Sequence, residues 1–239
     1  MPSKTVLSGE DIDQGATPNL LFQPGPVVDD WLLTFKPHVA LEALDTEVGR
    51  SELLMSVAPI RLMCSGGCVA VKYFHVRPTA KDVNCMIDPN VDAAPEYRQA
   101  LLDAVGAVAT AMQLQHDWMN DDLKSFIRSP KRMDLFLASV GQNIVLFSGA
   151  NVVVYAASME WALERKIRRV NRGRAVRHED LSDAAAIIKH MKGQGPPVSI
   201  AYLKGLNYNG FEGPMDLGIE LVRREYEKVY GEVGIADII

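Results

Sequence analysis

Two short stretches of this sequence bring together residue types that suit the binding and reaction of a phosphorylated ligand. Ser65, Gly66 and Gly67 follow an apolar run typical of a strand and precede a run typical of a helix. Glycines at such a turn let a phosphate approach backbone N–H groups. Asp82 and Asn84 lie two residues apart in the next predicted strand, so their side chains share one face. A carboxylate there can bind Mg²⁺ or accept a proton.

A third candidate group is a lysine on the apolar face of a helix predicted over residues 159–172. Lys166 falls within the core-facing stripe of that helix, where a lysine must reach solvent, pair with a carboxylate or point into a cleft. Asp180 and Asp183 on the next predicted helix are candidate partners. The alternative is a purely structural pair that locks the two helices together. The stripe itself comprises Met159, Ala162, Leu163, Ile167 and Val170.

The charge distribution adds an anion-binding feature to an acidic chain. The net charge is −5, from 25 Lys and Arg against 30 Asp and Glu, which argues against a general nucleic-acid binder. Seven basic residues and no acidic one nevertheless lie between Arg165 and Arg177. We expect four of them to gather opposite the apolar face and to bind an RNA backbone, with a solvated helix face as the alternative. The four are Arg165, Arg168, Arg169 and Arg172.

The pattern of apolar residues and turn residues predicts an α+β protein. We expect a small mixed β-sheet flanked by helices, followed by a C-terminal part that is helical to its end. The predicted strands cover residues 60–64, 82–87, 144–147 and 152–156. The predicted helices cover residues 27–48, 67–75, 97–114, 121–127, 159–172, 179–192, 199–206 and 215–230. As domains, this gives an irregular arm over 1–26, an α/β core over 27–157, and a helical part over 158–239 that packs on the core.

Composition places the chain among ordinary globular proteins, with 48% hydrophobic residues. No stretch has the apolar length of a membrane span, and the best candidate, residues 143–157, is typical of a β-hairpin. The first twenty residues lack the features of a signal peptide. Cys64 and Cys68 fit no zinc spacing and read as small core residues. We therefore expect a cytoplasmic protein without a membrane partner.

The glycine turn and the acidic strand together resemble the signature of the nucleotidyltransferase-fold superfamily, the group related to DNA polymerase β. The resemblance is carried by Ser65-Gly66-Gly67, a helix, and the run from Arg77 to Asn84. Residues 117–121, Asp-Trp-Met-Asn-Asp, resemble a stretch of uncharacterised nucleotidyltransferase-like proteins. The segment Ala157-Ser158-Met159-Glu160, followed by Lys166, Arg172, Asp180 and Asp183, resembles the C-terminal signature of the toxin-type branch. That branch includes abortive-infection toxins, some of which modify the acceptor end of tRNA. The resemblance covers roughly residues 58 to 192.

The resemblance implies roles for most of these residues. Asp82, Asn84 and Lys166 would be catalytic. A phosphate or substrate would be bound by Ser65, Gly66, Gly67, Arg77, Lys81, Asp180 and Asp183.

The chain departs from the family pattern at the metal site. Asn84 stands where the family has the second aspartate, and residues 152–155 offer no third carboxylate. Asp88 is six residues from Asp82, or about 20 Å along a strand, too far to replace it. Asp82 is therefore the one expected metal ligand, and Mg²⁺ is expected only if nucleotidyl transfer is retained. No other cofactor is expected.

Three functions remain open from the sequence. The first is a transferase that acts on tRNA or a nucleotide through a cleft with a degenerate metal site. The second is an aminoacyl-tRNA-dependent cyclodipeptide synthase of the arginine-containing type, which needs a general base but no metal. The third is a non-catalytic module that binds a nucleotide, RNA or a protein. Tyr202 to Phe211 is an aromatic stretch for which packing is favoured over a lid or pocket wall. DNA is not an expected partner.

Overall fold

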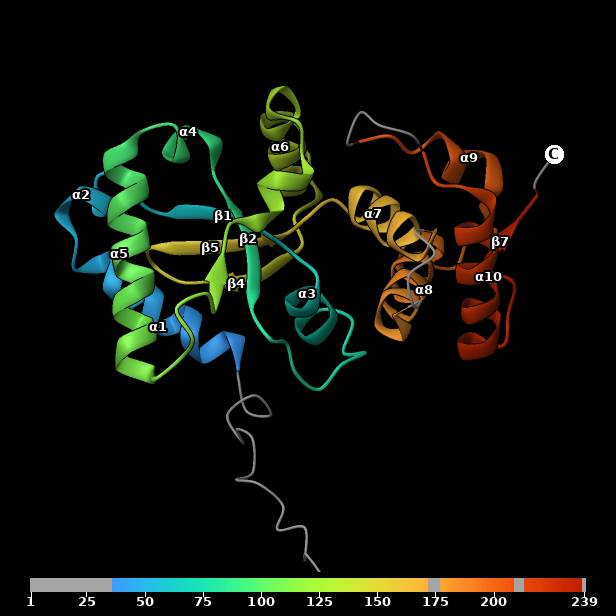
Figure 1. The fold of residues 1–239 in the computed structure, drawn as a ribbon, viewed down its shortest axis with the longest axis horizontal. Coiled ribbons are helices and arrows are strands. Elements are labelled where there is room, and N and C mark those ends of the chain that lie inside the picture. Colours follow the sequence, from blue (N-terminus) through green and yellow to red (C-terminus); the bar gives the residue numbers. More distant parts are fainter. Residues whose placement is uncertain (1–35, 172–176, 209–212, 238–239) are drawn as a thin grey trace, which may run out of the picture. The chain divides into compact units, whose positions relative to one another are not determined.

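The computed structural model describes residues 36–171, 177–208 and 213–237, all of which belong to one compact unit (Figure 1). The expected arm over residues 1–26, the first part of the helix expected over 27–48, and Arg172 lie outside the described residues. Within the described part the protein is α+β, as predicted, with a five-stranded mixed sheet and ten α-helices.

The sheet has the strand order β3-β2-β1-β5-β4. β1 is antiparallel to β2 and parallel to β5, β2 is parallel to β3, and β4 and β5 form the expected antiparallel hairpin. β3 was not predicted, because a strand of two residues shows no alternation of apolar and polar side chains. The strands are β1 (Ile60–Ser65), β2 (Val83–Ile87), β3 (Met119–Asn120), β4 (Val145–Ser148) and β5 (Val152–Ala156).

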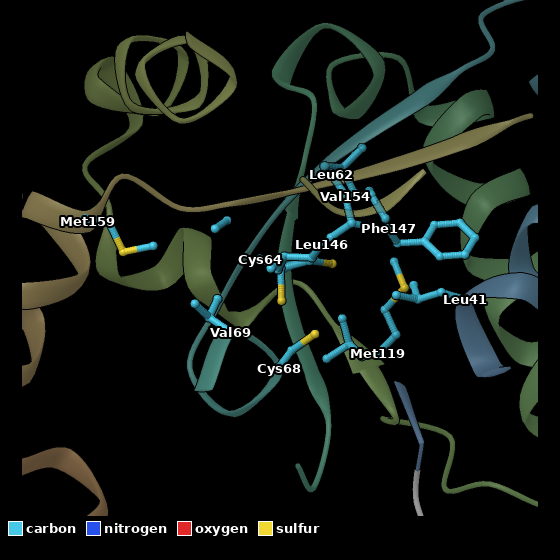
Figure 2. Close-up of a cluster of buried hydrophobic side chains, with 14 of the residues drawn as sticks. Leu41, Leu62, Cys64, Cys68, Val69, Met119, Leu146, Phe147, Val154 and Met159 are labelled. Carbon is cyan, nitrogen blue, oxygen red and sulfur yellow. The ribbon is translucent and has the colours of Figure 1, made fainter. Parts of the chain in front are cut away.

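The central strand β1 is buried on both faces, because helices cover each side of the sheet. Figure 2 shows Leu62 and Cys64 among the buried side chains of one face, together with Leu41 from α1. Met63 points to the other face and packs in a second buried cluster with Phe136 of α6. Cys64 and Cys68 are both buried, free thiols, in agreement with the prediction that they are core residues.

The helices before the hairpin are mostly short. Pro37 occupies the first turn of α1, where its missing N–H costs nothing, so the helix begins there. The segment expected to be a helix over 121–127 is a 3₁₀ helix, η2 (Asp122–Phe126). The others are α1 (Pro37–Gly49), α2 (Glu52–Met55), α3 (Gly67–Lys72), α4 (Pro89–Asp92), α5 (Pro95–Met112), η3 (Ser129–Lys131) and α6 (Arg132–Gln142).

Four helices follow the hairpin: α7 (Met159–Asn171), α8 (His178–Lys192), α9 (Ile200–Gly205) and α10 (Asp216–Tyr230). α7, α8 and α10 pack on one another. The predicted apolar stripe of α7 is confirmed, since Met159, Leu163, Ile167 and Val170 are buried and Ala162 is partly buried against the core. The expectation that this part is helical to its end is wrong, because β6 (Val198–Ser199) pairs in parallel with β7 (Ile235–Ala236). No helix among the described residues is long and apolar enough to cross a membrane.

Candidate functional site

A cavity of about 360 Å³ lies where the end of β1, the start of β2 and the helices α7 and α8 meet. We call it the glycine-turn cavity. Among the residues singled out in the sequence, Asp183 and Arg168 do not line it, and Arg172 is outside the described part of the chain. Eleven others do line it: Ser65, Gly66, Gly67, Arg77, Lys81, Asp82, Asn84, Arg165, Lys166, Arg169 and Asp180.

The turn after β1 depends on its two glycines for different reasons. Gly66 has φ +80° and ψ −135°, a backbone conformation that a residue with a side chain rarely adopts. Gly67 has an ordinary φ, but a Cβ atom there would lie 3.2 Å from the Cβ of Ala80. The first glycine permits the turn, and the second permits the turn to approach the segment that leads into β2. The helix that follows ends at Lys72, earlier than the predicted position 75.

The sheet register lines up three polar side chains beside the turn. Ser65 on β1 is paired with Asn84 on β2, which is paired in turn with Asn120 on β3. Directly paired residues present their side chains on the same face of a sheet. Asp82 is two residues before Asn84, so it reaches the same face. The row therefore surrounds one carboxylate with amide groups.

Both oxygens of Asp82 accept hydrogen bonds from these amides. Asn84 Nδ2 donates to Oδ1 at 2.6 Å, and Asn120 Nδ2 donates to Oδ2 at 3.3 Å. Burial raises the pKa of Asp82 above its ordinary value; the two amide hydrogen bonds oppose that shift, and the charges of Asp117 and Asp122 add to it. The result is a half-buried carboxylate with an enhanced affinity for a proton.

Lys166 is held between two buried aspartates of α8. Its Nζ lies 2.8 Å from Asp180 Oδ1 and 2.6 Å from Asp183 Oδ2. Arg77 reaches Asp183 with two bonds, at 3.0 Å from Nε and 2.6 Å from Nη2, and Arg169 Nε lies 3.2 Å from Asp180. The three cations thus share the carboxylates of Asp180 and Asp183. Asp183 does not itself line the cavity but holds two of the cations from outside it. Lys166 has the partners that its position on an apolar face required.

The arginines of α7 do not form the expected surface opposite the apolar face. Arg165 and Arg169 line the same cavity as Lys166, because at about 100° per residue they lie only about 100° and 60° from it around the helix. Arg168 is partly buried and lies 3.4 Å from the carboxylate of Glu164, which is fully buried. The prediction of a common face for these three arginines is therefore wrong.

Arg165 is held over aromatic rings. Its guanidinium carbon is 3.8 Å from the ring centre of Phe126 and 5.5 Å from that of Trp161. Burial, followed by the charge of Arg169, lowers the pKa of Arg165 to about 10, so it stays charged at neutral pH. A charged group held on an aromatic support at a cavity wall has little freedom to lose on binding an anion.

Three of the cations that line the cavity have no acidic partner in the described structure. No carboxylate oxygen of a described residue lies within 4.0 Å of the charged nitrogens of Lys81, Arg165 or Arg177. Among the described residues, six cations and three acids line the cavity: Arg77, Lys81, Arg165, Lys166, Arg169 and Arg177 against Asp82, Glu179 and Asp180. The excess of positive charge suits an anionic ligand.

The donor set does not fit Mg²⁺ in this arrangement. Both oxygens of Asp82 face amide N–H groups, which repel a cation, and the surrounding wall is positively charged. No group of three or more His, Cys, Asp or Glu residues that could hold a metal occurs among the described residues. Asp88, the acid considered in the sequence as a replacement for the missing carboxylate, pairs with Arg61 at 2.5 Å instead.

Three residues of the site are not predicted from the sequence, and one of them is Glu179, which lines the cavity and lies 3.4 Å from Arg77. Asn120 was read as part of a family-like stretch rather than as a partner of Asp82, and only the pairing of β3 with β2 reveals that contact. Arg177 belongs to the basic run but has no role assigned from the sequence.

Comparisons of the chain with protein-family models, with curated proteins and with solved structures found no match.

Proposed function

We propose that the protein is a transferase on a nucleotidyltransferase-type sheet, which binds the phosphate groups of a tRNA or a nucleotide in the glycine-turn cavity. The observation that carries the proposal is the group of three cations, Lys81, Arg165 and Arg177, that line one cavity and have no acidic partner among the described residues. Phosphate oxygens are the ligands that match such a group, since arginine binds them in a planar, two-pronged geometry. The order of β1, glycine turn, α3 and β2, with β1 antiparallel to β2, is consistent with that type of sheet.

Asp82 is the group best suited to the chemical step. Its raised pKa and its position between Asn84 and Asn120 suit a base that accepts a proton from an attacking hydroxyl or amine as the new bond forms. Lys166 and Arg169 would offset the charge that develops on the transferred group. No step is assigned to a metal, because the residues around Asp82 do not fit one.

Metal-independent aminoacyl transfer from charged tRNA is a second candidate. The specific observation in its favour is that Asp82 is bonded by two amides instead of a second carboxylate. Such a carboxylate can act as a base toward an amine and needs no divalent ion. Joining two aminoacyl groups in this way releases the tRNA as the leaving group.

The proposal is tested by measuring binding of bulk tRNA and of each nucleoside triphosphate, with and without Mg²⁺, over a series of salt concentrations. We expect binding that weakens steeply with salt, by roughly 0.7 to 0.9 in log K per log unit of salt for each phosphate contacted. Binding of tRNA that does not depend on Mg²⁺ would favour aminoacyl transfer, and charged tRNA would then be incubated with the protein and searched for amino-acid products. Nucleotide binding that requires Mg²⁺ would favour nucleotidyl transfer and would contradict the conclusion that the residues around Asp82 do not fit a metal. Failure of both ligands to bind would refute the proposal.

A further inference from the structure

A second cavity, larger than the first, lies on a different face of α7. Its volume is about 650 Å³, and we call it the tyrosine cavity because Tyr202 and Tyr208 line it together with Glu160. Glu160 precedes Arg165 by five residues, which is about 7.5 Å along the helix and about 140° around it. No described residue lines both cavities.

The carboxylate of Glu160 is held by two phenol groups. The hydroxyls of Tyr202 and Tyr208 each donate to one of its oxygens. Burial, followed by the hydrogen bond to Glu160, raises the pKa of Tyr202, so this phenol stays protonated and acts as a donor. A carboxylate oxygen can accept more than one hydrogen bond, so each keeps capacity for a further donor.

Within the described part of the chain, no cation pairs with the carboxylate of Glu160. Among the described residues, no nitrogen of Lys, Arg or His lies within 4.0 Å of its carboxylate. Lys131 also lines the cavity, but it is exposed and lies 3.4 Å from Asp134. The cavity thus holds one carboxylate that is fixed by neutral donors and lacks a cation.

The walls around this carboxylate are built by local structure. The N–H of Tyr202 donates to Ser199 Oγ at 3.0 Å, which caps the start of α9. The N–H of Tyr208 donates to the buried carboxylate of Glu164 at 2.6 Å. Leu135 of α6 and Leu206 provide apolar surface beside them. A fixed carboxylate, two aromatic rings and aliphatic side chains are the elements with which proteins bind organic cations.

We propose that the tyrosine cavity binds an organic cation, a guanidinium or a primary ammonium on an aliphatic chain, with the charged group on Glu160. The charged end would donate to the carboxylate oxygens and lie against the tyrosine rings. The aliphatic chain would lie on the leucine side chains.

The proposal is tested with three small probes of the same length: butylguanidinium, butylammonium and the neutral butylurea. Binding to the full chain is measured by NMR titration, following the backbone signals of Tyr202 and Tyr208. We expect at least one of the two cations to bind at least tenfold more tightly than butylurea, because a charge-assisted hydrogen bond is about twice as strong as a neutral one. Either cation alone is sufficient support. Equal binding of all three probes, or no shift with any, would overturn the proposal.

Three variants then locate the charge. Glu160→Gln keeps the size and the acceptor of the side chain and should weaken cation binding by roughly tenfold. Two control variants should change the affinity by less than about twofold. Asp134→Asn removes another acid of the same cavity, and Glu232→Gln removes the carboxylate that accepts from the Tyr226 hydroxyl elsewhere in the protein. Equal losses in all three would refute the role of Glu160. If Glu160→Gln does not fold, the comparison of cationic and neutral probes on the wild-type chain still decides.

Discussion

Helix α7 contributes to two cavities of opposite character. In the glycine-turn cavity, three cations lack an acidic partner among the described residues, and the one acid beside the strands, Asp82, is bonded by amides. In the tyrosine cavity, the charge without an ion-pair partner among the described residues is the carboxylate of Glu160. A single helix can serve both because residues five positions apart point to different sides.

The two cavities also differ in how much of the fold they depend on. The wall of the glycine-turn cavity includes a glycine with positive φ and a buried lysine that ties α7 to α8. In the tyrosine cavity, by contrast, the side-chain polar contacts among the described residues join lining residues to one another: Glu160 with Tyr202 and Tyr208, and Lys131 with Asp134. We infer that the first cannot change without a cost in stability, whereas the second can. Two predictions test this difference directly, and two more compare the cavities in ligand binding and in pH dependence.

The largest expected effect is that of Lys166→Met. Its removal leaves Asp180 and Asp183 buried with one cation fewer, so the free energy of unfolding should fall by about 3 kcal/mol. Glu160→Gln, on the same helix but in the other cavity, should lower it by less than about 1 kcal/mol. Urea unfolding of both variants measures the difference. Similar losses would show that the two cavities do not differ in this way.

The next effect concerns one glycine from each cavity. Gly66→Ala forces a side chain into a conformation with φ +80° and should cost about 2 kcal/mol. Gly205→Ala, at the end of α9, meets nothing within 4 Å and should be neutral or stabilising by up to about 1 kcal/mol. Thermal and urea unfolding check both values, and a destabilising Gly205→Ala would contradict the comparison.

A smaller effect is expected on ligand binding. Arg165→Gln removes one cation that has no acidic partner among the described residues, and it should weaken tRNA or triphosphate binding by roughly tenfold. The slope of log K against log salt concentration should become shallower by about the contribution of one phosphate contact. Tyr202→Phe, in the other cavity, should leave both quantities unchanged. The exposed Arg224→Gln on α10 is the control for a general change of net charge. An equal loss in that control would mean that the cavity is not the binding site.

The smallest effect is a pH dependence of stability. Because the pKa of Asp82 is raised in the folded state, the folded protein binds this proton more tightly than the unfolded chain. The stability from Asp82 is present in full below the ordinary pKa of an aspartate and is lost as the pH rises through the raised pKa. The Asp82→Asn variant should lose less free energy of unfolding than the wild type as the pH rises, whereas Asp134→Asn in the tyrosine cavity should lose as much as the wild type. Unfolding measured at several pH values from acid to neutral compares the slopes.

Local patterns predicted much of the fold. The alternation and apolar runs indicated four of the five strands of the sheet, and the glycines marked the turn after β1. The sequence did not reveal α6, in which Leu137 is exposed beside the buried Leu135 and Phe136, so that the apolar residues follow no clean helical period. It also did not reveal β6 and β7, which are two residues long and meet across more than thirty positions of chain.

Local patterns likewise predicted only those site residues that stand out within their own helix or turn. Lys166 was noticed because a lysine within an apolar stripe breaks a local rule, and the structure supplies both of its expected partners. The aromatic stretch after Tyr202 was expected to be simple packing, but Tyr202 and Tyr208 line a cavity; Phe211 lies outside the described residues. Glu160 belongs to a family-like segment of the sequence but received no role as a site residue, because an acid in the first turn of a helix is common and its tyrosine partners come from 42 and 48 positions away.

The sequence by itself determined the α+β class, the glycine turn, the acidic position before β2 and the misfit of Lys166, since each depends on residues within about one turn or one strand. The tertiary structure alone decided that Asn120 bonds to Asp82, that Arg165 and Arg169 face Lys166's cavity, and that Glu160 meets two tyrosines. These contacts join segments far apart in the chain. Their side-chain directions follow from strand register and helix packing, which no local pattern of residues specifies.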